Sequence, residues 1–384
     1  SYIDAFFETV SGFTTTGATI LADVEALSRG MLFWRGFTHW IGGMGILVFV
    51  VMLVNTPDRS INILKAEMPG PTVDKLVPKS KDTARTLYII YTALTALEVI
   101  FLLLGGMSLF DSVVHALSTA GTGGFGAYNA SAANFSPYIQ WVLTVFMFLF
   151  AINFNLFYLI LLGRMRDVFR NTEFRVYLAI VLVSVAVITA EIMPLYRTFS
   201  DSLRQAAFQV ASVISTTGFI TADFTVWTPL SKVLLLGLMF VGGCAGSTAG
   251  GLKVSRVAIL FKMMRRELRH TLRPRVVDVI KMDGRRLDEQ TAHSVAVYFA
   301  LYILSIAVLI VSLSFSRFDL ETNLFAAISC FNNVGPGFGI AGPVGNYSPY
   351  PPLFKLFLSA GMLLGRLEIY PMLLLFMPAA WRKR

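Results

Sequence analysis

Four short polar segments recur along this chain, and each follows an apolar stretch that is too short to cross a membrane. Each copy has a glycine six residues after a serine, at Ser11/Gly17, Ser118/Gly124, Ser212/Gly218 and Ser329/Gly335. Successive copies are about 100 residues apart, which leaves room for two membrane crossings beside each loop. A repeat at this interval predicts four pseudo-equivalent units in one chain.

The composition identifies an integral membrane protein. Hydrophobic residues make up 55% of the 384 residues and charged residues only 14%, whereas soluble domains carry roughly a quarter charged residues. A bilayer core requires roughly 20 apolar residues per helix. Runs of this kind lie at Met31–Val54, Leu87–Gly105, Tyr138–Gly163, Phe174–Met193, Thr291–Ser314 and Pro352–Met377. They lack the alternation of barrel strands, so an all-α membrane fold is expected.

Each unit reads as a membrane helix, a short helix, a polar loop and a second membrane helix around one central pore. The short helices are predicted at Tyr2–Ser11, Phe110–Thr119, Leu203–Ile214 and Leu320–Phe331. Such helices cover about half a bilayer, so the chain must re-enter and return to the same side. The units are assigned to residues 1–56 (incomplete at its N-terminus, with a crossing expected before Ser1), 57–172, 173–275 and 276–384.

The four loops have the composition of a cation pathway. Non-helical backbone at membrane depth must be buried in protein or line water, and backbone carbonyls can replace the hydration shell of an ion. Glycine adopts positive φ without penalty, and the short helices end with partial negative charge toward the pore. The loops contain no Asp or Glu, which favours a monovalent ion over calcium or magnesium.

Basic residues indicate the orientation of the chain. Arginine and lysine cluster after the second membrane helix of each unit, most densely from Lys262 to Arg286, whereas residues 105–138 carry one charge, Asp111. Cytoplasmic loops retain positive charge, so the polar loops should face outward and the basic loops the cytoplasm. The net charge of +9 is explained by this asymmetry and by contact with lipid headgroups. No nucleic-acid-binding module is present in the sequence.

Longer motifs resemble a known family. They are Ser11–Ile20 (SGFTTTGATI), Trp40–Ile46 (WIGGMGI), Lys65–Pro71 (KAEMPGP), Gly242–Val254 (GGCAGSTAGGLKV), Asn332–Gly337 (NNVGPG) and Gly365–Glu368 (GRLE). Over essentially the whole chain the sequence resembles the membrane subunit of the Trk/Ktr/HKT superfamily of potassium transporters, in its bacterial TrkH form. Like that family, it lacks the TVGYG signature of tetrameric channels.

The resemblance implies a potassium selectivity filter made by the four loops. Its residues are Thr14, Thr15, Thr16 and Gly17; Gly121, Thr122, Gly123 and Gly124; Ser215, Thr216, Thr217 and Gly218; and Asn332, Asn333, Val334 and Gly335. The fourth loop departs most, because Asn-Asn-Val replaces Thr and Ser. Inequivalent loops predict that one or two coordination sites dominate. Neighbouring hydroxyls are expected either to add ion ligands or to hold the loops.

A glycine-rich segment interrupts the second helix of the third unit. Five glycines in residues 242–251 cannot sustain a membrane helix, since each interior glycine costs about 1 kcal/mol relative to alanine. A tightly packed helix seam is the alternative reading. The resemblance implies a gating loop, with a gate formed by Gly242, Gly243, Gly246, Ser247, Thr248, Gly250, Gly251 and Arg366.

Charged residues near this segment are interpreted separately. A buried intramembrane charge such as Arg366 is a functional hypothesis by default; here it is either an electrostatic barrier, as the resemblance implies, or a hydrogen-bond donor to loop carbonyls. Glu368 is expected to point away from Arg366. Lys253 and Arg256 are expected at the cytoplasmic mouth. Four other polar membrane residues are interpreted as helix–helix contacts rather than ion ligands: Glu98, Asn153, Asn155 and Glu191.

The expected function is potassium uptake across the bacterial inner membrane, with no enzyme activity, no bound cofactor and the potassium ion as substrate. The resemblance implies a homodimer and a cytosolic nucleotide-binding regulatory subunit of the TrkA/KtrA type. Two alternatives stay open: sodium-permeable or sodium-coupled transport, and a secondary transporter with a midplane site. The latter predicts inverted repeats, whereas the four loops share one orientation.

Overall fold

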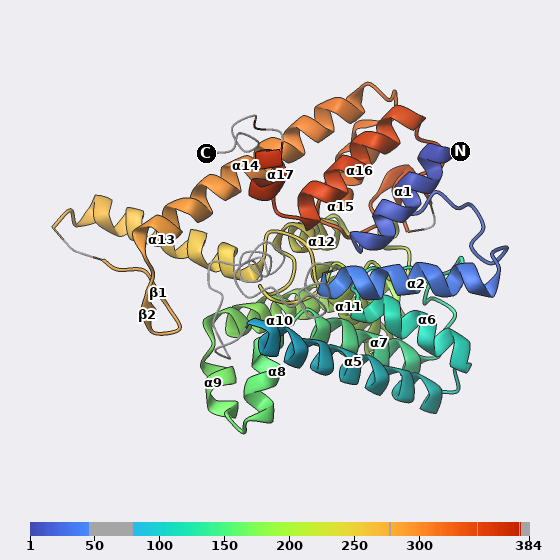
Figure 1. Ribbon diagram of the computed structural model, residues 1–384, viewed down its shortest axis with the longest axis horizontal. Helices are drawn as coiled ribbons and strands as arrows, with labels where there is room; N and C mark the ends of the chain where they lie inside the picture. The colour runs from blue at the N-terminus through green and yellow to red at the C-terminus, as the bar shows by residue number, and fades with distance from the viewer. Residues whose placement is uncertain (46–79, 276–277, 344, 376, 378–384) are drawn as a thin grey trace.

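The computed structural model describes residues 1–45, 80–275, 278–343, 345–375 and 377 (Figure 1). The Lys65–Pro71 motif and the end of the first apolar run lie outside these residues. The described chain is predominantly helical, and its only strands form a short antiparallel hairpin of β1 (Lys281–Met282) and β2 (Arg285–Arg286). The expected all-α class is confirmed.

The helices follow the predicted order of four units. The first unit has α1 (Tyr2–Phe13) and α2 (Arg29–Met44). The second has α5 (Ser80–Leu104), α6 (Leu109–Ala120), α7 (Pro137–Phe150), α8 (Phe154–Leu161) and α9 (Met165–Arg170). The third has α10 (Thr172–Ile192), α11 (Phe199–Ile214), α12 (Pro229–Val241) and α13 (Val254–Leu272). The fourth has α14 (Glu289–Ser314), α15 (Leu320–Phe331), α16 (Pro352–Arg366) and α17 (Ile369–Leu375).

Three described helical segments are long and apolar enough to cross a membrane unbroken: Ala84–Leu104, Thr172–Leu195 and Glu289–Ser314. Two predicted spans are broken. The run Tyr138–Gly163 is divided into α7 and α8, which are bent by 94°. At this break the carbonyl of Ala151 accepts from Cys244, and Phe154 N–H donates to the carbonyl of Gly246. The glycine-rich segment therefore takes up backbone groups that a continuous helix would have satisfied internally.

The run Pro352–Met377 is also divided. Helix α16 ends at Arg366, Glu368 adopts a φ of +65°, and α17 begins at Ile369. Arg366 is thus the last residue of a helix rather than part of a continuous span. This position lets its side chain leave the helix axis toward the centre of the molecule.

The short helices α1, α6, α11 and α15 begin with similar caps. In the first three, a Ser or Thr side chain accepts from the backbone of an aspartate three residues later, at Ser1/Asp4, Ser108/Asp111 and Thr198/Asp201. In α15 the roles are reversed, with Asp319 accepting from Thr322. Helix α11 starts at Phe199, one turn before the predicted Leu203, because its cap is Thr198. These capping motifs are readable in the sequence.

Packing of the short helices closes a ring. Each one contacts the membrane helix that follows the loop of the preceding unit: α6 packs on α2, α11 on α7, α15 on α12, and α1 on α16. Figure 1 shows the last of these contacts, where α1 lies beside α16 although they are at opposite ends of the chain. The four units therefore surround one central axis.

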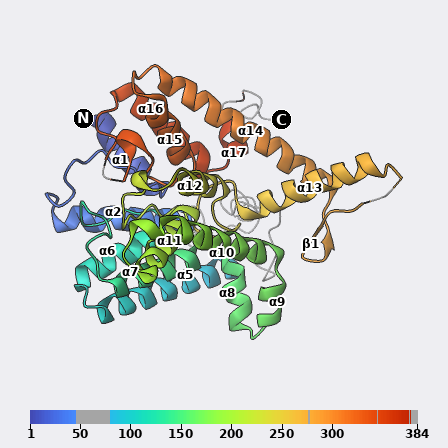
Figure 2. The same ribbon diagram turned by 180° about the vertical axis from the view of Figure 1, so that it is seen from behind.

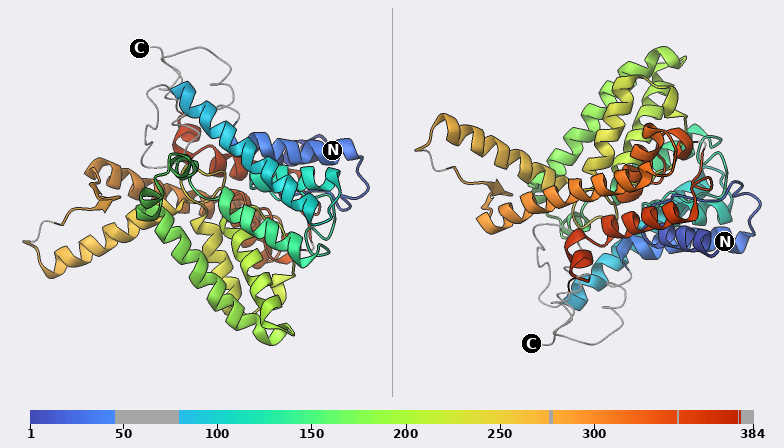
Figure 3. Two further views of the ribbon diagram at one scale, coloured as in Figure 1. Left: turned by 90° about the horizontal axis from the view of Figure 1, so that it is seen from below. Right: turned by 90° about the horizontal axis from the view of Figure 1, so that it is seen from above.

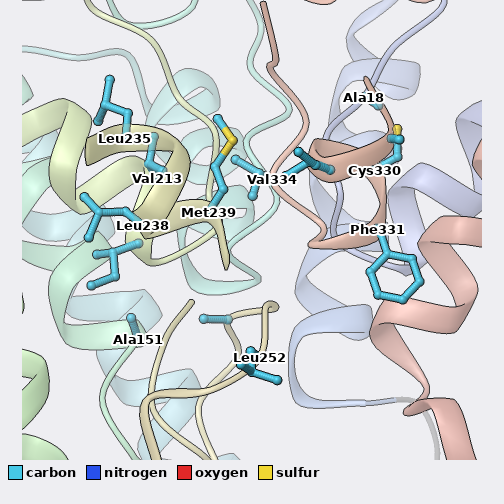
Figure 4. Packing of buried hydrophobic residues seen from close by; sticks show 14 of the residues in the cluster. Ala18, Ala151, Val213, Leu235, Leu238, Met239, Leu252, Cys330, Phe331 and Val334 are labelled. Atoms are coloured by element: carbon cyan, nitrogen blue, oxygen red, sulfur yellow. The ribbon is translucent and has the colours of Figure 1, made fainter. Parts of the chain in front are cut away.

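Helix α13 and the β1–β2 hairpin project from this ring, as the view from behind shows (Figure 2) and as the views from below and above confirm (Figure 3). Apolar side chains pack around the loops. Figure 4 shows buried side chains from α11, α12, α15 and the chain segments next to them, including Val213, Met239, Leu252 and Val334. This packing fixes the polar loops in a rigid surround.

Candidate functional site

The four polar loops share one backbone conformation. Four residues after the repeat serine, a non-glycine residue has positive φ: 53° at Thr15, 54° at Thr122, 56° at Thr216 and 57° at Asn333. Two residues later the repeat glycines have φ of 75°, 79°, 81° and 94°. In every loop the intervening N–H donates to the serine carbonyl, over 2.9, 2.9, 2.9 and 3.0 Å. The sequence repeat is therefore a structural repeat.

The repeat glycines pack in a closed ring. A β-carbon on each would lie far inside contact distance of a carbonyl oxygen from the next loop. The pairs and distances are Gly17 with Gly123 O (1.9 Å), Gly124 with Thr217 O (2.0 Å), Gly218 with Val334 O (2.1 Å) and Gly335 with Thr16 O (2.5 Å). Each glycine is thus required by φ and by space. The sixteen residues predicted for the filter come together around one axis.

Seven of the eight carbonyl oxygens in this ring accept no hydrogen bond from a described residue. No described residue donates a hydrogen bond to the carbonyls of Thr16, Gly123, Thr217 or Val334, nor to those of Gly17, Gly124 and Gly218. The four loops therefore present a ring of oxygen acceptors around one axis. A dehydrated cation is the ligand whose chemistry fits oxygen acceptors.

Cavities adjoin the loops at both ends. All four repeat glycines line a cavity of about 170 Å³ together with Asn129 and Tyr347. A second cavity of about 290 Å³, the inner cavity, is lined by Thr14, Arg366 and the glycine-rich segment. The ring of carbonyls therefore has open space on the two sides from which an ion would enter and leave.

Hydroxyl groups hold the loops in place. The repeat serines donate to the carbonyl seven residues later, from Ser118 to Phe125 (2.6 Å), from Ser212 to Phe219 (2.7 Å) and from Ser329 to Pro336 (2.9 Å). Ser11 makes no such bond to a described residue. Further hydroxyl pairs join Thr14 to Thr16 (2.8 Å) and Ser215 to Thr217 (2.7 Å). Of the two roles expected for the hydroxyls, these contacts establish the structural one.

The fourth loop is tied to its surroundings by amide side chains. Asn332 accepts from the hydroxyl of Tyr302 and donates to Ile328 O over 2.9 Å. Asn333 donates to the hydroxyl of Thr16 and to Met362 O, each over 3.0 Å. The unusual Asn-Asn pair therefore joins the fourth loop to the first loop and to α14 and α16.

Tyr347 is a neighbour of the fourth loop that sequence reasoning missed. Its buried hydroxyl donates to the carbonyl of Gly335 over 2.8 Å, while its own N–H donates to Thr19 O. The carbonyl of Gly335 is the one repeat-glycine carbonyl that has a donor among the described residues. The four loops are consequently unequal, as their sequences predicted.

The glycine-rich segment lies against the loops. Gly250 N–H donates to the hydroxyl of Thr216 over 2.6 Å, and the hydroxyl of Thr122 donates to Thr248 O over 2.9 Å. A β-carbon on Gly250 would lie 2.4 Å from Asn332 O. Positive φ at Gly242, Gly246 and Gly251 turns the chain out of the helix. The segment is unwound rather than a helical packing seam.

Arg366 joins this segment to the first unit. Its guanidinium donates to Thr248 O over 2.6 Å and to the carbonyls of Gly42 and Gly43 over 2.7 and 2.8 Å. It also lines the inner cavity. These bonds to loop carbonyls are one of the two roles expected for Arg366, and its charged side chain lines the inner cavity.

Glu368 pairs with Arg256 over 2.7 Å and lines the inner cavity together with Arg366. Arg256 in turn lies over the ring of Tyr298, with 3.9 Å from its guanidinium carbon to the ring centroid. Arg256 and Lys253, expected at the cytoplasmic mouth, are both buried. Lys253 lines the inner cavity and donates to Ala249 O. Both therefore have protein partners near the segment, which the sequence did not indicate.

The remaining polar candidates differ in their contacts. Asn153 caps α8 by accepting from Asn155 N–H, which agrees with a structural role. Both carboxyl oxygens of buried Glu98 lack a described hydrogen-bond partner. Glu191 is the next-to-last residue of α10 and is partly exposed.

Four helix–loop units that close a ring of backbone carbonyls between two cavities define a channel-like membrane transport protein. Residues 1–383 match the TrkH family, described as "Cation transport protein". The chain belongs to this family, whose members are transporters rather than enzymes.

Named relatives agree with this assignment. The chain is 38% identical to "Trk system potassium uptake protein TrkH" of Salmonella typhimurium, over 99% of this chain and 80% of that protein. It is 35% identical to "Trk system potassium uptake protein TrkI" of Halomonas elongata, over 100% and 78% of the two chains. The crystal structure of "the Potassium Transporter TrkH from Vibrio parahaemolyticus" superposes with a TM-score of 0.89 at 34% identity, covering 100% of this chain and 80% of that one. The predicted family resemblance is confirmed.

Proposed function

We propose that this protein takes up potassium across the bacterial inner membrane, down its electrochemical gradient, through a gated pore. The observation that carries the proposal is the closed ring of glycines, whose neighbouring carbonyls have no protein donor among the described residues. Relatives similar to this chain are named potassium uptake proteins. The potassium ion is the substrate, and no cofactor takes part.

The selectivity filter comprises Thr14–Gly17, Gly121–Gly124, Ser215–Gly218 and Asn332–Gly335. Carbonyl oxygens of the last two residues of each loop coordinate the dehydrated ion, while the loop hydroxyls orient the backbone. Because Gly335 O already accepts from Tyr347, the coordination sites differ in strength. The absence of carboxylates from the loops supports a monovalent ion.

The gate comprises the glycine-rich segment, residues 242–251, and Arg366. In the closed conformation the segment lies under the filter, and Arg366 places a positive charge in the inner cavity. A cation that leaves the filter meets both barriers. Opening requires the Arg366–Thr248 contact to break and the segment to move aside.

The orientation and partners follow from the distribution of charge. The filter loops face outward, and the basic face from Lys262 to Arg286 faces the cytoplasm. Helix α13 and the β1–β2 hairpin carry this face away from the ring (Figure 1). It supports docking of a cytosolic nucleotide-binding regulatory subunit of the TrkA/KtrA type. The membrane protein itself acts as a homodimer within the lipid.

Reconstitution in liposomes tests the proposal. Tracer potassium uptake is measured with sodium and lithium as competitors, for the parent protein, Gly218→Ser and Arg366→Ala. Potassium-selective flux that Gly218→Ser reduces and Arg366→Ala increases supports the filter and the gate. Flux that sodium carries equally well supports the sodium-permeable alternative. If neither ion passes while an ion gradient drives another solute, the protein is a secondary transporter.

A further inference from the structure

We propose that Glu173 is a second latch of the gate, which holds the glycine-rich segment closed from α10 independently of Arg366. This inference rests on the proposed gate and adds a residue to it. Glu173 lies in the first turn of α10 and is 6% exposed. Nothing in the local sequence distinguishes it from an ordinary acidic residue at a helix start.

One carboxylate oxygen of Glu173 joins two parts of the segment. Its Oε1 accepts from Ala245 N–H over 2.7 Å and from Ser255 N–H over 3.0 Å. Ala245 lies inside the glycine-rich segment, and Ser255 lies in the first turn of α13, just beyond it. The carboxylate therefore links the glycine-rich segment to the start of α13.

The chemistry explains why a carboxylate is placed here. The first N–H groups of a helix have no partner within it, and α13 receives no side-chain cap from its own N-cap residue, Lys253. A negative charge at a helix N-terminus is favourable. Glu173 thus caps α13 from another helix, and its second bond, to Ala245, is not needed for that cap. The bond to Ala245 is the part that bears on gating.

The same bond opposes opening of the gate. Moving the segment away from the filter separates Ala245 from Glu173 and removes a donor from a buried carboxylate, which is unfavourable. Arg366, the last residue of α16, donates to the carbonyl of Thr248, which lies three residues after Ala245. Two side chains from two units therefore hold the closed segment at separate points. Loss of either one shifts the balance toward the open form.

The first test measures basal potassium flux in liposomes without any regulatory subunit. Glu173→Ala is compared with Glu173→Gln, which keeps an oxygen acceptor, and with Glu191→Gln, a matched change on the same helix. We expect Glu173→Ala to increase basal flux about tenfold or more, since it removes a charge-assisted hydrogen bond that the closed segment makes. Glu173→Gln should increase it less, and Glu191→Gln should leave it unchanged.

A merely structural role predicts a different result. If Glu173 only stabilises α13, then Glu173→Ala lowers flux and thermal stability together, and basal flux does not rise. Potassium-over-sodium selectivity should be unchanged in the latch variants, because the filter is intact. If the parent conducts potassium and Arg366→Ala increases flux but Glu173→Ala does not, then the proposed role of Glu173 is wrong. The proposed gate of residues 242–251 and Arg366 is still supported in that case. If none of these proteins conducts potassium, the proposed function itself fails.

A second test does not depend on conduction. Cys244 precedes Ala245 and is fully buried, and Cys330 is the only other cysteine of the chain. In a Cys330→Ala background, Cys244 is the single thiol, and a small methanethiosulfonate reagent measures how often the segment leaves its site. We expect Glu173→Ala to increase the labelling rate about tenfold. The control is Cys330 in a Cys244→Ala background, where the rate should stay constant. Equal rises at both cysteines indicate general unfolding and overturn the latch.

Discussion

The hydroxyl of Tyr347 donates a 2.8 Å hydrogen bond to the carbonyl oxygen of Gly335, the glycine of the fourth loop. The other three repeat glycines have no described donor at their carbonyls. One side chain therefore accounts for an asymmetry in a ring that is otherwise repeated four times. It also removes one oxygen from the set that is wholly free for an ion.

Changing Tyr347 to Phe should make the protein more dependent on potassium for its stability. Without the hydroxyl, Gly335 O loses its donor, and an unsatisfied buried carbonyl costs about 1–3 kcal/mol. A bound cation can supply that interaction, so potassium should raise the melting temperature of Tyr347→Phe more than that of the parent. The measurement is thermal unfolding in detergent with and without potassium.

Tyr350→Phe is the matched control for this prediction. Tyr350 is equally buried, but its hydroxyl donates to Asn323 rather than to the filter. Its loss should lower stability without changing the shift that potassium produces. Equal potassium shifts in both variants would show that Gly335 O takes no part in ion binding.

Alanine at Gly17 or Gly124 should abolish selective potassium flux. Both positions combine positive φ with a β-carbon that would lie about 2 Å from a neighbouring carbonyl, at 1.9 and 2.0 Å. The loops must separate to accept it, which widens the ring. Gly237→Ala in α12 is the control, because a β-carbon there meets nothing within 4 Å. That change should preserve flux and stabilise α12 by up to about 1 kcal/mol. Unchanged potassium-selective flux in Gly17→Ala would show that the close packing of the glycine ring is not needed for selectivity.

The cap of α15 makes a prediction about pH. The hydroxyl and N–H of Thr322 donate to Asp319 and hold the pKa of its carboxyl below the usual value. A depressed pKa means that this stabilisation is present above the unfolded pKa of about 3.9 and is lost as pH falls through the folded pKa. Asp319→Ala should destabilise the protein by about 1 kcal/mol at pH 7. As the pH falls below the unfolded pKa of about 3.9, the difference from the parent should shrink, as followed by thermal unfolding at several pH values.

Local patterns explain which features were predictable. The short helices and loops were read correctly because a half-length apolar run, a polar turn and a repeated glycine are neighbours in sequence. The break between α7 and α8 was not predictable, because Ala151 and Asn153 lie in an apolar run. The helix is interrupted there by hydrogen bonds with a segment that comes almost 100 residues later in the chain. Glu173 and Tyr347 could not be identified from the sequence, because each acts through hydrogen bonds to other elements, Glu173 with Ala245 and Ser255 and Tyr347 with Gly335. The caps at Ser108 and Thr198, by contrast, are local motifs.

An ion pair between Glu8 of α1 and Arg35 of α2 couples the first two loops. Arg35 donates to Glu8 over 2.8 Å and lies over the Phe125 ring of the second loop, with 3.9 Å to its centroid. The same carboxylate accepts from the Thr19 hydroxyl and Ile20 N–H, at the exit of the first loop. The side chains of Glu8 and Arg35 are only 16% and 6% exposed. Removing either partner therefore leaves a largely buried charge unpaired beside the loops.

Glu8→Ala should destabilise the protein by about 3–5 kcal/mol, because it leaves Arg35 buried and unpaired. Adding Arg35→Met should recover much of that loss, since a well-packed apolar pair can replace a buried ion pair. Arg164→Ala is the control: its pair with Asp167 is exposed, with side-chain exposures of 61% and 40%, and should matter by less than about 1 kcal/mol. Denaturant unfolding of the parent, the two single variants and the double variant gives the coupling energy. Losses that simply add in the double variant would show that Glu8 and Arg35 stabilise the loops independently rather than as a pair.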